Sequence, residues 1–362
     1  MSKVLMKGNE AIGEAAIKAG CRYFFGYPIT PQSELPEYLS RRLPEVGGVF
    51  LQAESEIAAI NMVYGAAAAG RRAMTSSSSP GISLKQEGIS YLAGSELPCL
   101  IVNIMRGGPG LGGIQPSQSD YFQATKGGGH GDYRVIVLAP ASVQEIADLV
   151  KKGFDLADHY RMPVLILGDG LLGQMMEPVD FGTETSGDDF ERPWAATGKN
   201  GRAHTKVIRS LYLKPEELEA HNRKLEKKYL TICAKETMAE QYLTADAEIV
   251  LAAYGMTARI AKAAADLARA EGIKAGVFRP ITLWPFPERE LNEATKKAQV
   301  VLTVEMSLGQ MVEDVKLTLN GRLPVEFYGR VGGMIPTTQD VLKEVKKIAE
   351  GLKEAQKNDG SF

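Results

Sequence analysis

The chain reads Gly26-Tyr-Pro-Ile-Thr-Pro-Gln-Ser-Glu34 between a strand-like run, Cys21 to Phe25, and a helical pattern, Leu35 to Leu43. Its two prolines fix φ and push the residue before each of them out of the helical region. We therefore expect Thr30 to lie on a stiff turn at the end of a strand, with its hydroxyl and N–H facing outward. In open α/β sheets, ligands bind at the carboxyl ends of the strands. The plain alternative is a turn in which Thr30 caps the following helix.

Strand and helix patterns alternate around this turn, from residue 8 to about residue 170. The run Pro98–Met105 is continuously apolar, which is typical of a parallel strand that is buried on both faces. The alternation predicts a doubly wound parallel α/β sheet. The other strands that we expect are Arg22–Phe25, Val49–Gln52, Arg72–Thr75, Val135–Leu138 and Val164–Leu167.

The alternating pattern breaks once and then resumes, which predicts two α/β domains. We place the first domain at residues 1–176 and a polar connector, with a charged helix Lys214–Lys228, at residues 177–240. A second, smaller doubly wound domain occupies residues 241–362. Its expected strands are Ile249–Ala253, Ala275–Arg279, Val300–Val304 and Val325–Tyr328.

The composition is that of an ordinary globular protein, with 362 residues, 44% hydrophobic residues and 24% charged residues. The formal net charge of -2 gives no reason to expect a nucleic acid or an anionic membrane as partner. No segment has the order of a signal peptide or the length of a membrane span, so we expect a cytoplasmic protein. The cysteines are too far apart for a CxxC site, so we expect no iron–sulfur or zinc site on this chain; they are Cys21, Cys99 and Cys233.

Polar groups follow four of the expected strands. Because parallel strands end at the same edge of a sheet, we expect these groups to meet there. An arginine offers a planar fork to a carboxylate, a glutamate offers an acceptor or a proton carrier, and serines ahead of a helix suit an anion. The groups are Thr30, the pair Glu54 and Glu56, the segment Thr75-Ser-Ser-Ser-Ser-Pro-Gly81, and Arg106 ahead of a glycine-rich loop to Gly113.

Plain structural alternatives exist for most of these groups. Glu54 or Glu56 would also suit the first turn of its helix, where the macrodipole favours an acid. The serine segment would also suit a flexible loop. Arg106 is harder to explain in this way, because an arginine directly after a fully apolar strand is costly without a partner.

Two further motifs match known cofactor sites only formally. Gly108-Pro-Gly-Leu-Gly-Gly113 fits GxGxxG, but its own proline and the following Gln115-Pro116 argue against a dinucleotide site. Gly168-Asp-Gly170 with Asn200 has the spacing of the Mg²⁺ motif of thiamine-diphosphate enzymes. Asn200 lies in a turn of the polar connector, so we interpret that match as accidental.

Taken in order, these motifs resemble those of one family. The chain resembles the α subunit of the 2-oxoacid:ferredoxin oxidoreductases, above all of the branched-chain (2-oxoisovalerate) and 2-oxoglutarate members. The resemblance covers nearly the whole chain and implies a pyrimidine-type thiamine-diphosphate-binding domain, followed by a domain like the C-terminal domain of transketolase. The motifs are Tyr27-Pro-Ile-Thr-Pro31, Glu54-Ser-Glu-Ile57, the serine segment, Arg106-Gly-Gly-Pro109, Gln144-Glu145, Tyr254-Gly-Met-Thr257 and Phe278-Arg-Pro-Ile-Thr-Leu-Trp-Pro285.

The resemblance implies a reaction and a set of partners. Thiamine diphosphate would be shared with a β subunit that holds the diphosphate, Mg²⁺ and a [4Fe–4S] cluster, none of them on this chain. A 2-oxoacid would be decarboxylated oxidatively to acyl-coenzyme A and CO₂, and the electrons would pass through the β cluster to ferredoxin. An anaerobic host, an (αβ)₂ assembly and a small ferredoxin-like γ or δ subunit are implied in the same way.

The resemblance also implies roles for single residues. Glu56 would be catalytic and would hydrogen-bond the aminopyrimidine ring of the cofactor, with Glu54 as the less suitable acid. Arg106 would clamp the carboxylate of the substrate, and Thr30 would donate to that carboxylate or to the adjacent carbonyl. The cofactor or the subunit junction would be lined by Pro28, Ile29, Ser76, Ser77 and Ser78.

Two other functions stay open at this point: a non-catalytic assembly or binding subunit of transketolase-like fold, and a thiamine-dependent 2-oxoacid decarboxylase that releases an aldehyde. The choice of 2-oxoacid is open too. A 2-oxoglutarate enzyme needs a second cation, for which Lys126 and Arg134 are candidates, whereas a branched-chain enzyme needs an apolar pocket. His130, in a glycine-rich turn, would either reach the site or stand on the surface.

Overall fold

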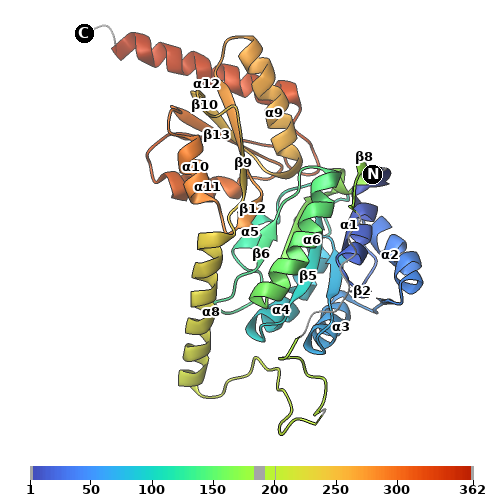
Figure 1. Ribbon diagram of the computed structural model, residues 1–362. Coiled ribbons are helices and arrows are strands. Elements are labelled where there is room, and N and C mark those ends of the chain that lie inside the picture. The colour runs from blue at the N-terminus through green and yellow to red at the C-terminus, as the bar shows by residue number, and fades with distance from the viewer. Residues whose placement is uncertain (1–2, 183–191, 200, 360–362) are drawn as a thin grey trace.

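The computed structural model describes residues 3–182, 192–199 and 201–359 of the chain. They form two α/β units that stack on each other, with the C-terminal unit at the top of Figure 1 and the N-terminal unit below it. The long helix α8 (Pro215–Lys235) runs along one side of the lower unit. None of the described helices combines the length and the apolar character that a crossing of the lipid bilayer requires.

The larger sheet has seven strands in the order β12-β6-β7-β5-β4-β2-β3. Every neighbouring pair is parallel except β12 with β6, so the predicted doubly wound parallel sheet is confirmed, with one antiparallel edge strand added. The strands are β2 (Tyr23–Gly26), β3 (Val49–Gln52), β4 (Ala73–Ser77), β5 (Cys99–Met105), β6 (Ile136–Leu138), β7 (Pro163–Asp169) and β12 (Thr282–Trp284).

Helices cover both faces of this sheet, which explains the apolar character of β5. Alternate β5 side chains point to opposite faces. Leu100 and Val102 pack with α1 (Gly8–Lys18), α2 (Glu34–Glu45) and α6 (Val143–Tyr160). Ile101 and Met105 pack with α3 (Glu56–Ala68) and α4 (Ser79–Gly94). Short elements complete this unit: β1 (Val4–Lys7), α5 (Tyr121–Thr125), α7 (Gly170–Gln174) and β8 (Met176–Val179), which pairs with β1.

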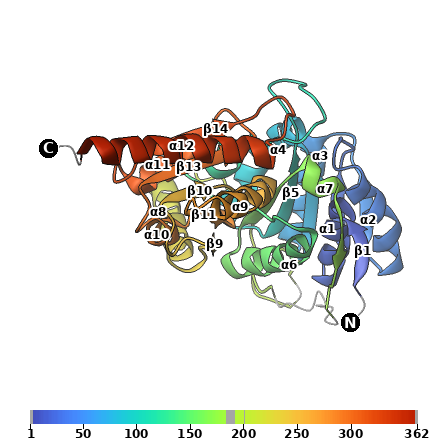
Figure 2. The same cartoon turned by 90° about the horizontal axis from the view of Figure 1, so that it is seen from above.

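The second sheet has five strands in the order β14-β13-β10-β11-β9. Helices α9 (Gly255–Ala270) and α12 (Thr338–Asp359) pack on one face, and α12 extends beyond the unit as a long rod in Figure 2. The other face, with α10 (Glu288–Ala294) and α11 (Met311–Leu319), shares a hydrophobic core with the first unit. The strands are β9 (Ala239–Tyr242), β10 (Ile249–Ala252), β11 (Ala275–Pro280), β13 (Val300–Glu305) and β14 (Val325–Gly329).

The two units are joined by more than this core. Strand β12 lies in the C-terminal part of the sequence but pairs with β6 of the first sheet. Arg279 of β11 is buried and donates to both carboxylate oxygens of Glu145 on α6, at 2.8 and 2.6 Å, and to Glu240 at 2.8 Å. The two units thus share a core and a sheet. The domain boundaries at residues 176 and 240 remain a proposal.

Some predicted elements differ from the observed ones. The serine segment is not a loop: Thr75–Ser77 belong to β4, and Ser79 already begins α4, whose first turn contains Pro80. Proline suits that position because its missing N–H has no helical partner there. Thr30 is not a helix cap either, since the residue before α2 is Ser33.

Candidate functional site

The turn after β2 and the end of β5 meet at the carboxyl edge of the first sheet. Arg106 is only 7% exposed, and its Nη1 donates to the main-chain carbonyl of Thr30 at 3.0 Å. Its Nη2 donates to the carbonyl of Leu111 at 3.2 Å. Thr30 itself is exposed, as predicted, beside exposed Pro28 and half-buried Ile29. Arg106 and Thr30 thus form one end of a candidate site.

The start of α3 places an acid at the same edge. Ser55 caps this helix by accepting the N–H of Ala58 at 3.2 Å, and Glu56 is its first residue. Glu56 is buried, at 7% exposure, whereas Glu54 is exposed. Of the two acids considered from the sequence, only Glu56 therefore lies in a protected environment.

The first turn of α4 brings these groups together. A Cβ added to Gly81 would lie 2.7 Å from Oε1 of Glu56 and 2.0 Å from Oγ of Ser77, so any larger residue would have to displace both side chains. Two residues earlier, the hydroxyl of Ser79 accepts the main-chain N–H of Arg106 at 3.0 Å. One helical turn thus contacts both the glutamate and the arginine segment. Thr30, Glu56 and Arg106, which lie on separate loops in the sequence, are therefore connected through this turn in the structure.

Unpartnered polar atoms gather around this turn. Ser76 donates its hydroxyl to Oε1 of Gln32 at 2.5 Å. Within the described part of the chain, four buried polar atoms nearby have no hydrogen-bond partner. They are Oγ of Ser77, Oγ of Ser78, Nε2 of Gln32 and Nε of Arg106. Buried polar groups are nearly always hydrogen-bonded, so this cluster suits a polar ligand.

Lys85 is a member of the site that the sequence reasoning missed. It is fully buried on α4, and its Nζ donates to the hydroxyl of Thr75 at 3.0 Å and lies 3.5 Å from the carbonyl oxygen of Glu56. Burial lowers the pKa of Lys85 to about 8, and attraction to Glu56 opposes that shift. The signal in the sequence was its spacing of three and four residues from Ile82 and Ile89, which puts a charge on the buried stripe of the helix.

Asp120 is a second missed residue. It accepts from the hydroxyl of Ser79 at 2.6 Å and from Nδ2 of Asn103 at 2.9 Å. Burial raises the pKa of Asp120, although both donors act against that rise. The signal was Asn103, a polar residue inside the otherwise apolar strand β5. Through Ser79, Asp120 supports the turn that contacts Glu56 and Arg106.

The Gly-Asp-Gly segment has a structural use. Oδ1 of Asp169 caps α7 by accepting the N–H groups of Leu171 and Leu172, both at 3.0 Å. Burial raises the pKa of Asp169 to about 6. Asn200, its partner in the formal motif, lies outside the described residues. Among the residues that are described, no cluster of three or more histidine, cysteine or acidic side chains could hold a metal ion.

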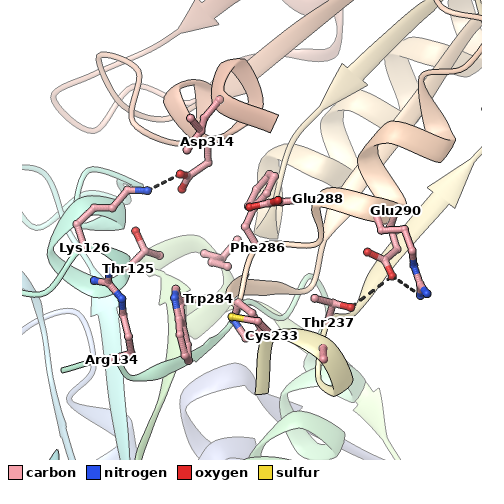
Figure 3. Close-up of a pocket in the computed structure, with 15 residues that line it drawn as sticks. Thr125, Lys126, Arg134, Cys233, Thr237, Trp284, Phe286, Glu288, Glu290 and Asp314 are labelled. Carbon is pink, nitrogen blue, oxygen red and sulfur yellow. Dashed lines mark hydrogen bonds and ion pairs between the residues drawn. The ribbon is translucent and has the colours of Figure 1, made fainter. Parts of the chain in front are cut away.

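The cations considered for a second substrate carboxylate lie elsewhere. Lys126 and Arg134 line a cavity of about 460 Å³ next to Trp284, at the β12 edge of the sheet (Figure 3). Lys126 points at Asp314 and forms an ion pair with it. Arg134 precedes β6 and so lies at the amino end of a strand, whereas the candidate site lies at carboxyl ends. Neither cation is placed to serve a ligand that is bound at Arg106.

His130 lies against the C-terminal half of α4. Its Nδ1 is 3.4 Å from the hydroxyl of Ser90, and its ring meets the ring of Tyr91 edge-on. Ser90 is eleven residues beyond Ser79, which corresponds to about 16 Å along a helix. Of the two expectations for His130, the surface position agrees with this packing.

Family models match most of the chain. A model described as pyruvate flavodoxin/ferredoxin oxidoreductase, thiamine-diphosphate-binding, matches residues 14–242. A second, pyruvate:ferredoxin oxidoreductase core domain II, matches residues 247–341. The chain is 52% identical to the ketoisovalerate oxidoreductase subunit VorB of Methanothermobacter marburgensis, over 96% of this chain and 99% of that one. It is 38% identical to the 2-oxoglutarate synthase subunit KorA of Methanothermobacter thermautotrophicus, over 95% of this chain and 98% of that one.

Two solved structures are similar to this chain in fold. A 2-oxoglutarate:ferredoxin oxidoreductase from Magnetococcus marinus, with 2-oxoglutarate, coenzyme A and succinyl-CoA bound, superposes with a TM-score of 0.85 at 29% identity. The match covers 96% of this chain but 65% of that longer chain. A split-gene transketolase, an inactive β4 tetramer, is similar at a TM-score of 0.59 and 17% identity, which indicates a common fold alone.

Proposed function

This chain belongs to the 2-oxoacid:ferredoxin oxidoreductase family, and from that membership we propose that it is the α subunit of an enzyme that oxidises a branched-chain 2-oxoacid such as 2-oxoisovalerate. The products are CO₂ and an acyl-coenzyme A, and ferredoxin takes up the electrons. The observation that carries the proposal is the first turn of α4, which holds Glu56 on one side and the Arg106 segment on the other.

The residues at this turn fit the pyrimidine end of thiamine diphosphate. When bound, that cofactor supplies the nucleophilic carbon that decarboxylation of a 2-oxoacid requires. Glu56 offers its buried carboxyl group to a ring nitrogen, where it holds or transfers a proton. The free hydroxyls of Ser77 and Ser78 supply further hydrogen bonds, and Gly81 leaves room beside the acid. Pro28, Ile29 and Ser76 complete the lining in this proposal.

Arg106 and Thr30 hold the substrate in this proposal. The guanidinium already donates to two main-chain carbonyls, which orients it, and its Nε has no acceptor in the described part of the chain. A 2-oxoacid carboxylate at this position accepts from Arg106 and from the exposed hydroxyl of Thr30. Charge-assisted hydrogen bonds of this kind contribute about 1.5–3 kcal/mol.

The choice of a branched-chain substrate follows from charge. No charged residue occurs between Arg106 and Asp120, nor between Gly26 and Glu34, so the two segments around the site offer a single cation. A second carboxylate, as in 2-oxoglutarate, would lack a counterion here. Leu111 and Ile114 expose apolar side chains on the same loop. The relative with 52% identity is named for ketoisovalerate, which agrees with this choice.

A β subunit completes the enzyme in this proposal. It holds the diphosphate of the cofactor, Mg²⁺ and a [4Fe–4S] cluster. Two α chains and two β chains form an (αβ)₂ assembly. Asp169, which the formal Mg²⁺ motif would use, caps α7 instead, and this fits a division of labour in which the β subunit holds the metal. A small ferredoxin-like γ or δ subunit and a cytoplasmic location belong to the same proposal.

The test is reconstitution of this chain with a β subunit of the same family, under anaerobic conditions. Turnover is measured as reduction of a viologen dye with coenzyme A, on 2-oxoisovalerate, 2-oxoglutarate and pyruvate in parallel. We expect the largest kcat/KM for 2-oxoisovalerate. Larger values for 2-oxoglutarate would overturn the substrate assignment. Release of aldehyde without dye reduction would favour a simple decarboxylase, and a complex without any turnover would favour a non-catalytic subunit.

A further inference from the structure

A buried lysine lies directly behind the proposed catalytic glutamate. Lys85 is 0% exposed and follows Gly81 by one turn of α4. Its Nζ bonds the hydroxyl of Thr75 and approaches the main-chain carbonyl of Glu56. Lysine is almost never fully buried unless it is paired, because a desolvated ammonium is costly. A cation at this position therefore calls for a functional reason.

The acid that Lys85 interacts with is Glu56. Glu56 is the one charged residue of α3, and β4 and β5 carry none. Among the other charged residues of α4 and β7, Glu87 is exposed and accepts from Tyr91, and Asp169 caps α7. Attraction to Glu56 is also the interaction that opposes the effect of burial on the pKa of Lys85. The contact itself is made to the main-chain carbonyl of Glu56, so the attraction between the ammonium and the carboxyl group acts over a longer distance.

We propose that Lys85 is a positioning residue for Glu56, which anchors the start of α3 through the Glu56 carbonyl and places a positive charge behind the acid, so that the acid meets the cofactor ring in one orientation. The inference rests on the function proposed above. Because Lys85 is fully buried, it acts through Glu56 and does not touch a ligand. Without Lys85, the start of α3 loses the donor to the Glu56 carbonyl, and the buried acid loses a nearby positive charge.

A double-mutant cycle isolates this coupling. The variants are Lys85→Met, Glu56→Gln and the double variant, and the measurement is the affinity of the cofactor-free αβ complex for thiamine diphosphate, by calorimetry at pH 7. We expect Lys85→Met to weaken binding about tenfold when Glu56 is present and less than about twofold in the Glu56→Gln background. An equal loss in both backgrounds would mean that Lys85 only supports the fold, and would overturn the proposal.

Two further variants separate charge from hydrogen bonding. Lys85→Gln keeps donors towards Thr75 and the Glu56 carbonyl but lacks the charge, so we expect it to bind the cofactor as weakly as Lys85→Met. Wild-type affinity in Lys85→Gln would overturn the role of the charge. The matched control is Lys297→Met, which removes an exposed lysine far from the site and should leave the affinity unchanged.

The unmodified complex gives a test that needs no variant to fold. As Lys85 loses its proton near pH 8, the affinity for thiamine diphosphate should fall between pH 7.5 and 9, and Lys85→Arg should abolish that fall. A flat wild-type profile would overturn the inference. If Glu56→Gln changes neither cofactor affinity nor turnover, the proposed function fails; if Glu56→Gln matters but shows no coupling to Lys85, only this inference fails.

Discussion

The guanidinium of Arg106 donates to the carbonyl of Thr30 at 3.0 Å, so the end of β5 is tied to the turn after β2. These segments are about 75 residues apart in the sequence and two strand positions apart in the sheet. The bond orients the arginine before any ligand arrives. A site prepared in this way loses little freedom on binding, which favours affinity.

Arg106→Met removes the proposed carboxylate clamp. We expect kcat/KM for 2-oxoisovalerate to fall about ten- to a hundredfold, which corresponds to the loss of one charge-assisted interaction. The affinity for thiamine diphosphate should stay unchanged, because that cofactor is held elsewhere in the site. Arg134→Met is the matched control, since Arg134 lies at the cavity of Figure 3 and should leave kcat/KM as it is. Similar losses in the two variants would contradict the assignment.

Glu56→Gln tests the proposed proton carrier. The amide keeps the shape of the side chain but cannot hold or transfer a proton as a carboxyl group does, so we expect turnover to be abolished. The αβ complex should still assemble, as judged by size-exclusion chromatography. Glu54→Gln changes an exposed acid two residues earlier and should retain turnover. Activity in the first variant or loss of activity in the second would reverse the choice between the acids.

Gly81→Ala tests the close contact at the first turn of α4. The added Cβ would overlap Oγ of Ser77 and press on Oε1 of Glu56, so the acid must move. We expect a decrease of at least about tenfold in both kcat and cofactor affinity. Gly351→Ala adds a methyl group to α12 where no atom lies within 4 Å of it, and should leave activity intact. Wild-type kinetics in Gly81→Ala would show that the site tolerates displacement of Glu56.

Lys85→Met should make the chain more stable at neutral pH. The pKa of Lys85 is about 8 in the folded state, against an ordinary value of 10.5, so the folded protein binds this proton more weakly than the unfolded chain does. Below pH 8 the burial of the charge lowers the free energy of unfolding by on the order of 3 kcal/mol. Replacing lysine by methionine restores part of that free energy.

The stability advantage of Lys85→Met over the wild type should decrease as pH rises. Between pH 8 and 10.5 the unfolded chain holds more protons, so the wild type gains stability as pH rises and the advantage of the variant shrinks. Urea unfolding at pH 7 and pH 9.5 measures both values, with Lys297→Met as the control. A variant that is less stable than the wild type at pH 7 would show that the bonds to Thr75 and Glu56 outweigh the cost of burial.

The fold could be predicted because its strongest signals are local. The apolar run of β5 and the alternation of strands and helices need only periodicity, and the predicted strand ends lie within one or two residues of the observed ones. Strand β12 was missed because it has three residues and pairs with a strand about 145 residues earlier. Such a pairing leaves no periodic trace in the sequence.

Part of the candidate site could be proposed from the sequence. Thr30, Glu56 and Arg106 stood out because each follows a strand in a motif with distinctive glycines or prolines, and the family resemblance agreed with the family models. Their meeting at one turn of α4 depends on packing that motifs do not encode. Lys85 was missed because a lysine is expected in solvent, and only the structure shows that Thr75 and Glu56 enclose it.

Strand β12 has a consequence for how the enzyme can open. Because β12 is hydrogen-bonded to β6, a hinge motion that swung the C-terminal unit away would have to peel a strand from the large sheet. We therefore expect the two units to stay joined when a ligand reaches Arg106. A gene truncated after residue 240 would also leave β6 with a bare edge, which invites pairing with a foreign strand.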